Sequence, residues 1–266
     1  MLEAIFRYEY MQNAVFAAIL GSLICGIIGT IIVEKRLVGM SGGIAHASFG
    51  GIGAGYYFSI EPILGGLLFA IVSSLSVSQI QKRTNAYADT IVSMFWAAGM
   101  AIGILFISMT PGYPPDMSSY LFGDILTVSR LYLYIMAGLT LVVILTISSL
   151  FNYWKIYLFD EEYAKIIKLS VNKLEMILYV LIAISIVLLI KVVGIILSIS
   201  MLTIPPTIAK KFTFDLKHIM ILSSLLGIIF SLLGLTLSYY LNIPSGASII
   251  LISIVAFFIT GLKSKN

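Results

Sequence analysis

The sequence offers few side chains that could do chemistry, and the most unusual of them is a histidine inside an apolar stretch. The segment GMSGGIAHASFGGIGAGYYF, residues 39–58, surrounds His46 with seven glycines. An ionisable group at membrane depth is a functional candidate, and imidazole binds Zn, Cu, Fe and Ni well. The alternative is a neutral imidazole that donates a hydrogen bond to a carbonyl of a neighbouring helix. The residues alone leave both interpretations open.

Three aspartates are the other candidate site residues. Asp89 stands in NAYADTIV, where an acidic residue in a first helical turn favours the positive end of the helix dipole, so capping is the simpler interpretation. Asp116 and Asp124 belong to TPGYPPDMSSYLFGD, whose prolines and glycines predict an ordered turn. Asp116 is placed like the N-cap of a short helix. The functional hypothesis for this segment is a gate or a docking surface.

Two common catalytic motifs are absent from the sequence. GxxxxGK[ST] and HExxH do not occur, so the chain has no phosphate-binding loop and no zinc-protease signature. A membrane-embedded metalloenzyme would need several ligands at membrane depth, and only His46 and peripheral carboxylates are available. We therefore expect a chain that is not an enzyme.

The glycines around His46 are spaced for close helix packing. One row recurs every four positions, which is a ridge of a helix surface. Small residues in such a ridge let two backbones approach closely in a membrane. The sequence predicts a closely packed or bent helix, with these glycines at the contact: Gly39, Gly43, Gly51 and Gly55, with Ala47 between them.

The elements that position these residues are membrane helices. The chain has 266 residues, of which 60% are hydrophobic and only 11% charged, against about 25% charged in a soluble domain. Its apolar runs approach the roughly 20 residues that cross a bilayer as a helix. The fold class is an all-α polytopic membrane protein, a single transmembrane domain over 1–266 with eight or nine spans, some short or broken. The candidate spans are 12–33, 42–60, 62–80, 89–109, 130–151, 174–191, 193–209, 218–240 and 245–262.

The basic residues predict the orientation. With nine spans and the N-terminus outside, thirteen of the sixteen Lys and Arg residues fall in cytoplasmic connections, as the positive-inside rule requires. The exceptions are Arg7, Arg130 and Lys191. The C-terminus is then cytoplasmic, segment 110–127 is an extracytoplasmic loop, and segment 152–173 is cytoplasmic.

The cytoplasmic segment carries an amphipathic helix signal. Acidic residues precede basic ones within 158–173, which suits the helix dipole, and the apolar residues follow helical spacing. Such a helix could lie on the membrane surface. The residues singled out in it are Phe159, Asp160, Glu161, Glu162, Tyr163 and Lys165.

Five blocks, in order, resemble the ABC-3 permeases, the membrane subunits of zinc- and manganese-type ABC importers. The blocks are MQNAVFAAILGSLICGIIGTIIVEKRLVGMSGGIAHASFGG (11–51), YADTIVSMFWAAGMAIGI (87–104), DMSSYLFGDIL (116–126), VGIILSISMLTIPPTIAKKF (193–212) and LSYYLNIPSGASIIL (237–251). The family motif is Asp-x-x-x-His. His46 matches its histidine, but Gly42 stands where the family has aspartate.

The resemblance implies a fold, partners and a function. It implies a type II importer fold in the plasma or inner membrane, a homodimer with the pathway between copies, and two copies of a separate ATPase seated on segment 152–173. An extracytoplasmic metal-binding protein would deliver Zn²⁺ or Mn²⁺, or Fe²⁺, as a transported ion. No permanently bound cofactor and no nucleic acid are implied.

Two other functions remain open from the sequence. A gradient-driven secondary transporter or channel predicts internal repeats with matched broken helices, which the sequence does not show. An ABC permease for a metal chelate is the second alternative, although such chains are longer.

Overall fold

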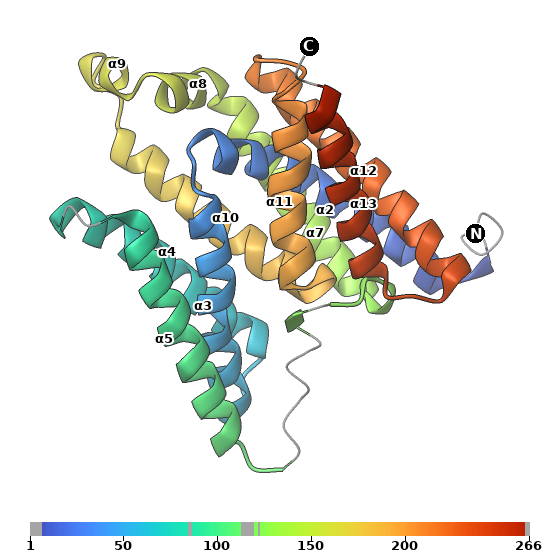
Figure 1. The fold of residues 1–266 in the computed structure, drawn as a ribbon. Helices are drawn as coiled ribbons and strands as arrows, with labels where there is room; N and C mark the ends of the chain where they lie inside the picture. Colours follow the sequence, from blue (N-terminus) through green and yellow to red (C-terminus); the bar gives the residue numbers. More distant parts are fainter. Residues whose placement is uncertain (1–6, 85–86, 113–119, 122, 264–266) are drawn as a thin grey trace.

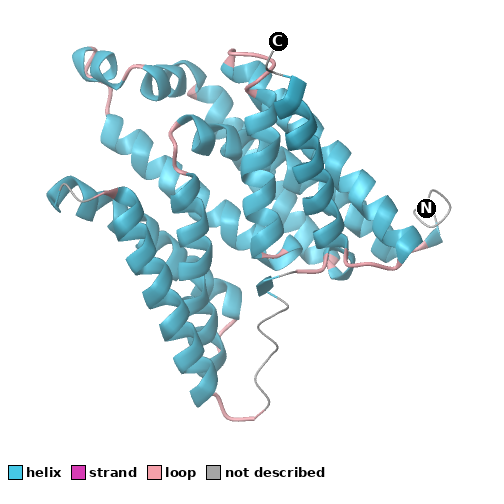
Figure 2. Cartoon of the chain, in the orientation of Figure 1, coloured by secondary structure: helices cyan, strands magenta, loops and turns pink. Residues whose placement is uncertain are grey.

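The structure is a computed structural model that describes residues 7–84, 87–112, 120–121 and 123–263. Within these ranges the chain forms eleven α-helices and one 3₁₀ helix and no strand, with short loops between helices (Figure 2). The helices are α2 (Glu9–Glu34), α3 (Val38–Tyr57), α4 (Pro62–Thr84), α5 (Ala88–Met109), η1 (Ile125–Thr127), α7 (Arg130–Ser149), α8 (Phe151–Phe159), α9 (Glu161–Ile166), α10 (Val171–Val193), α11 (Ile195–Ala209), α12 (Leu216–Leu241) and α13 (Ser245–Lys263).

Six helices are long and apolar enough to cross a membrane, which confirms the prediction of an all-helical membrane protein. They are α2, α4, α5, α7, α10 and α12. The helices α11 and α13 are apolar but offer shorter apolar stretches, and glycine-rich α3 is not among the six. Each of the nine predicted segments is helical, but the predicted number of eight or nine spans is not confirmed and stays a prediction.

The helices form two groups that α10 joins. The helices α3, α4 and α5 pack together at one side of the molecule, and α2 packs against α7, α11 and α12 in the other group (Figure 1). α2 is apolar around its whole circumference, which is the pattern of a helix buried inside a bundle. α10 contacts α3 and α4 on one side and α2 and α11 on the other. Because α10 contacts both groups, a movement of one group relative to α10 also changes its position relative to the other group.

Segment 152–173, which the sequence predicted to be cytoplasmic, contains a helix that starts after Asp160, as the charges within 158–173 predicted, but a second short helix precedes it. The structure has two short helices, α8 and α9, separated at Asp160, whose carboxylate accepts a hydrogen bond from the backbone N–H of Tyr163 at 2.8 Å. α9 ends at Ile166, and Lys168 takes a left-handed backbone conformation with φ of 56°. Capping by Asp160 starts a new helix, and the turn at Lys168 redirects the chain into α10.

The proline pair of the seventh predicted span does not end its helix. Pro205 and Pro206 lie inside α11, which continues to Ala209. Prolines remove backbone donors, and threonine hydroxyls bond carbonyls in this part of the helix: Thr203 to Ile199 at 2.8 Å and Thr207 to Thr203 at 2.6 Å.

Candidate functional site

Helix α3 is built so that its neighbours meet its main chain. A Cβ added to Gly51 would overlap the backbone carbonyl of Gly65 in α4, and one added to Gly53 would lie 2.5 Å from the carbonyl oxygen of Gly103 in α5. No real Cβ contact is that short. Glycine at these positions is therefore required by the approach of α4 and α5, which offsets its helix-weakening effect of about 1 kcal/mol per residue.

The predicted ridge of small residues faces two different helices. At its start, the positions of Gly39 and Gly43 lie against Asp89 and Val92 of α5; toward its end, Gly51 and Gly55 lie against α4. A step of four residues advances about 40° around a helix of 3.6 residues per turn. The ridge therefore winds around α3 and serves both contacts in turn.

His46 stacks on an aromatic side chain of the neighbouring helix. Its ring lies parallel to that of Trp96 in α5, with ring centroids 4.3 Å apart and an angle of 6° between the planes. The Nδ1 atom is buried and has no hydrogen-bond partner among the residues that the structure describes. The alternative interpretation was a neutral imidazole that donates a hydrogen bond to a carbonyl of a neighbouring helix. Among the described residues no such carbonyl bonds Nδ1.

Gly42, one turn before His46, leaves space for a side chain. A Cβ at this position would meet only Cδ1 of Ile199, at an ordinary contact distance of 3.7 Å. The position is therefore sterically open to the aspartate of the family motif. The residue whose carboxylate lies closest to the start of the ridge is Asp89, and it sits beside Gly39, about two helical turns from His46.

The described residues contain no group of three or more His, Cys, Asp or Glu side chains that could hold a metal ion. His46 could supply one imidazole ligand, and the remaining ligands would have to be water, main-chain carbonyls or groups from another chain. Such a site binds weakly compared with a site of three or four protein ligands. Weak binding suits a transported ion, which must also leave.

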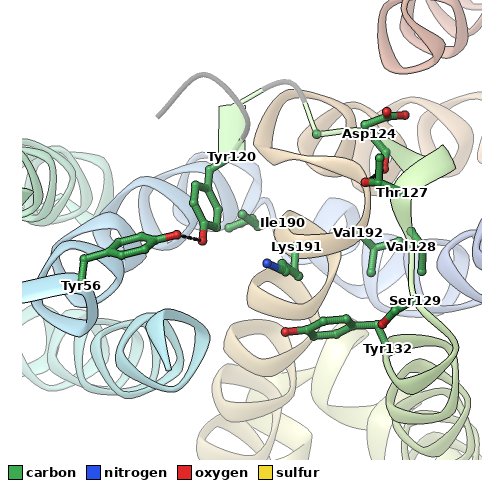
Figure 3. A pocket seen from close by; sticks show the side chains of 11 residues that line it. Tyr56, Tyr120, Asp124, Thr127, Val128, Ser129, Tyr132, Ile190, Lys191 and Val192 are labelled. Carbon is green, nitrogen blue, oxygen red and sulfur yellow. Dashed lines mark hydrogen bonds between the residues drawn. The ribbon is translucent and has the colours of Figure 1, made fainter. Parts of the chain in front are cut away.

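A polar cavity of about 530 Å³ lies between the two helix groups, at the end of the molecule opposite α8 and α9 (Figures 1 and 3). The hydroxyls of Tyr56 in α3 and Tyr120 lie 2.8 Å apart. The hydroxyl of Tyr132 in α7 donates to the carboxylate of Glu61 at 3.4 Å. The Lys191 ammonium lies 5.7 Å from the ring centre of Tyr120 and 5.5 Å from that of Tyr132. We call this the outer cavity.

The outer cavity holds the positive charge of Lys191 and the carboxylate of Asp124. Burial, and then the hydrogen bond with Tyr56, raises the pKa of Tyr120, so this phenol stays neutral. Among the described residues Lys191 forms no ion pair, and its charge is met by the faces of the two tyrosine rings. The carboxylate of Asp124 accepts the backbone N–H of Leu126 at 3.0 Å, which caps η1.

Sequence reasoning did not select Lys191 as a site residue. The signal was present, because Lys191 is one of three basic residues that fall outside the predicted cytoplasmic connections. Tyr56, Tyr120 and Tyr132 come from separate segments, and their sequence spacing gave no sign that they meet.

The remaining predicted site residues that the structure describes lie apart from His46. Asp116 lies outside the described residues. Asp89 is in the first turn of α5, as predicted, and is exposed. Phe159 and Tyr163 are exposed at α8 and α9, and Glu161, Glu162 and Lys165 also belong to α9.

Comparison with known proteins assigns the chain to a family. The model of the ABC 3 transport family matches residues 7–264, and the chain therefore belongs to this family. An uncharacterized membrane protein of Synechocystis sp. is 43% identical over 98% of this chain and 92% of its own length. The manganese import system permease protein ScaB of Streptococcus gordonii is 29% identical over 97% of this chain and 93% of its own.

A solved structure has the same fold. It is PsaBC from Streptococcus pneumoniae in complex with a Fab, one chain of which is 28% identical to this chain and matches it with a TM-score of 0.87. The match covers 97% of this chain and 93% of the other. The helix arrangement described above is thus shared with this solved chain.

Proposed function

We propose that this chain is the membrane permease subunit of an ATP-binding cassette importer for divalent metal ions. Mn²⁺ and Zn²⁺ are the main candidate cargoes and Fe²⁺ a third. The observation that carries the proposal is the similarity, over nearly the whole length of both chains, to a manganese import permease. The chain catalyses no covalent step in this scheme, since ATP hydrolysis belongs to a separate subunit, and it holds no permanent cofactor.

The proposed topology has nine spans, with α3, α11 and α13 completing the six long ones, and the N-terminus outside. The C-terminal end of α13 lies at the same end of the molecule as α8 and α9, and the outer cavity lies at the other end (Figure 1). This supports a cytoplasmic C-terminus and an outer cavity that faces the extracytoplasmic side.

The proposed partners dock at the two ends. Two ATPase subunits contact the coupling segment 152–173 of a permease homodimer, and its exposed residues Phe159 and Tyr163 support this assignment. An extracytoplasmic metal-binding protein contacts segment 110–127, including Asp116 and Asp124. The ion passes His46 along the thin surface of α3.

Alternating access follows from where the two helix groups touch. The Tyr56–Tyr120 and Tyr132–Glu61 hydrogen bonds cross the outer end, and Lys82 and Ser78 of α4 bond Glu175 of α10 at the other. To open one end of the molecule, the hydrogen bonds at that end must break while those at the opposite end stay intact. ATP binding and hydrolysis in the partner would select which end is open.

The decisive test is uptake of radiolabelled manganese into vesicles that contain the permease, its ATPase and the binding protein. Uptake is expected to require ATP, and His46→Ala is expected to lower it about tenfold at low metal concentration. His218→Ala is the matched control, because His218 is the only other histidine and instead bonds Asp215 at the start of α12.

One outcome would refute the import function, and a second would refute the role of His46. Full-rate uptake without an ATPase would point to a gradient-driven transporter. Undiminished uptake by the His46→Ala protein would remove this residue from the pathway.

A further inference from the structure

An apolar groove runs between α7 and α12. α2 packs against both α7 and α12 and forms the floor of the groove, whose volume is about 520 Å³. Nine of its twelve lining residues are apolar, and they include Leu23, Ile27, Ile144, Ile221, Leu225 and Ile228. The one charged lining residue is Lys217, in the first turn of α12.

The groove has the length of one bilayer leaflet. Lys217 and Ile228 are eleven residues apart on α12, which corresponds to about 16 Å at 1.5 Å per residue. Half of a hydrocarbon core of about 30 Å is about 15 Å. The charge therefore lies at the depth of a headgroup when the apolar part spans the depth of an acyl chain.

We propose that this groove binds one anionic phospholipid, with an acyl chain between α7 and α12 and the phosphate on the Lys217 ammonium. α7 and α12 are both long, apolar membrane helices, and Ile221 and Leu225, about half exposed, present their side chains to the bilayer. Basic residues at the end of a groove between membrane helices are a known arrangement for acidic headgroups. The hydroxyl-bearing Ser148 lines the same end.

The charge of Lys217 is available to such a ligand. Among the described residues no carboxylate forms an ion pair with Lys217. The neighbouring Asp215 accepts hydrogen bonds from the backbone N–H of His218 at 3.0 Å and from its ring Nδ1 at 2.9 Å. The carboxylate nearest in sequence is therefore already engaged.

The test is lipid titration of the purified permease–ATPase complex, followed by native mass spectrometry. Phosphatidylglycerol is expected to bind one site per chain about fivefold tighter than phosphatidylcholine with the same acyl chains. Lys217→Glu is expected to abolish this preference, and Lys217→Arg to keep it. Lys173→Glu, an exposed lysine at the start of α10 outside the groove, is the charge control.

The groove itself is tested with a matched pair on one helix. Ile221→Trp fills the groove and is expected to weaken the binding of both lipids. Ile229 is equally exposed (49%) but lies outside the groove, so Ile229→Trp is expected to leave the binding of both lipids unchanged. The proposal is overturned if Lys217→Glu and Ile221→Trp bind both lipids as the wild type does.

Crosslinking tests whether a second copy of the chain occupies the groove instead of a lipid. In a Cys25→Ala background, Ile221→Cys would form a disulfide-linked dimer in high yield if two copies met here, and that result would also overturn the proposal. Because these measurements use no metal, their failure would leave the proposed import function standing, and failure of ATP-dependent uptake would leave the lipid site standing.

Discussion

The ammonium of Lys82, near the C-terminal end of α4, forms an ion pair with the carboxylate of Glu175 in α10. The same carboxylate accepts a hydrogen bond from the hydroxyl of Ser78 at 2.7 Å, and Lys82 also donates to the side chain of Asn172 at 3.1 Å. Glu175 is largely buried, with 12% of its side chain exposed. One carboxylate thus joins the three-helix group to α10.

Glu175→Ala is expected to lower the free energy of unfolding by about 1–2 kcal/mol, because it removes two charge-assisted bonds and leaves Ser78 without its partner. Thermal or denaturant unfolding of the purified complex measures this change. The control is Glu9→Ala, which breaks the exposed Glu9–Arg130 ion pair and is expected to cost less than about 0.5 kcal/mol. Equal effects of the two variants would contradict the structural role of Glu175.

Gly51→Ala is expected to destabilise the permease by about 2 kcal/mol, because the new methyl group would overlap the carbonyl of Gly65 and force α3 and α4 apart. Gly42→Ala, on the same helix, adds a methyl group at an ordinary contact distance and gains helix propensity, so it is expected to be neutral or stabilising. Unfolding curves of the two variants give the comparison, and a Gly51→Ala protein as stable as wild type would show that α4 is not held so closely.

Gly42→Asp is expected to tighten manganese binding about tenfold. The carboxylate would lie one turn from His46 on the same helix face, and carboxylate oxygen suits Mn²⁺ better than imidazole does. Equilibrium binding of Mn²⁺, followed by its paramagnetic resonance signal, measures the change. Gly42→Asn has nearly the same shape without the charge, and equal affinity of the Asp and Asn variants would show that the carboxylate does not reach the ion.

Lys191→Gln is expected to lower the KM for metal uptake about fivefold at low ionic strength, because a positive charge in the outer cavity repels a divalent cation. Lys191→Arg keeps the charge and is expected to behave like wild type. The difference between Gln and Arg is expected to shrink as salt is added, since screening weakens the repulsion. A KM that is the same for Gln and Arg at every salt concentration would place Lys191 off the route of the ion.

The stability that Asp215 gives to the start of α12 is expected to depend on pH. The backbone N–H of His218, and then its side chain, lower the pKa of Asp215 below its ordinary value of 3.8. A lowered carboxyl pKa means that the stabilisation is complete above the ordinary pKa and is lost as the pH falls through the lower, folded-state value. Asp215→Ala is therefore expected to lower the Tm slightly at pH 7 and to make no difference at a pH below the folded-state pKa. Differential scanning fluorimetry at both pH values checks this, and a mutant effect that grows on acidification would contradict it.

The sequence predicted the helices well because each continuous apolar run can satisfy its backbone groups in a membrane only as a helix. It also placed Asp160 beside a helix start, where the structure has it. It did not predict α8 as a separate helix before Asp160, because the charges that mark a helix start and end all follow α8.

The candidate site was harder to predict for a geometric reason. Sequence spacing shows which residues share a face of one helix, but not which face meets which neighbour. The ridge of α3 therefore looked like one contact and serves two, and the stacking of His46 on Trp96 had no signal at all. Lys191 could be noticed as an exception to the charge rule, although its tyrosine neighbours could not.

The bare backbone contacts of α3 also bear on how the protein can move. Where Gly51 meets Gly65 and Gly53 meets Gly103, no side chain stands between the helices whose rotamer could readjust. If α3 slid past α4 or α5, backbone carbonyl groups would collide. We therefore expect no low-energy movement of these three helices relative to one another. The three helices are expected to rock as one solid body, and the bending must be absorbed at their edges.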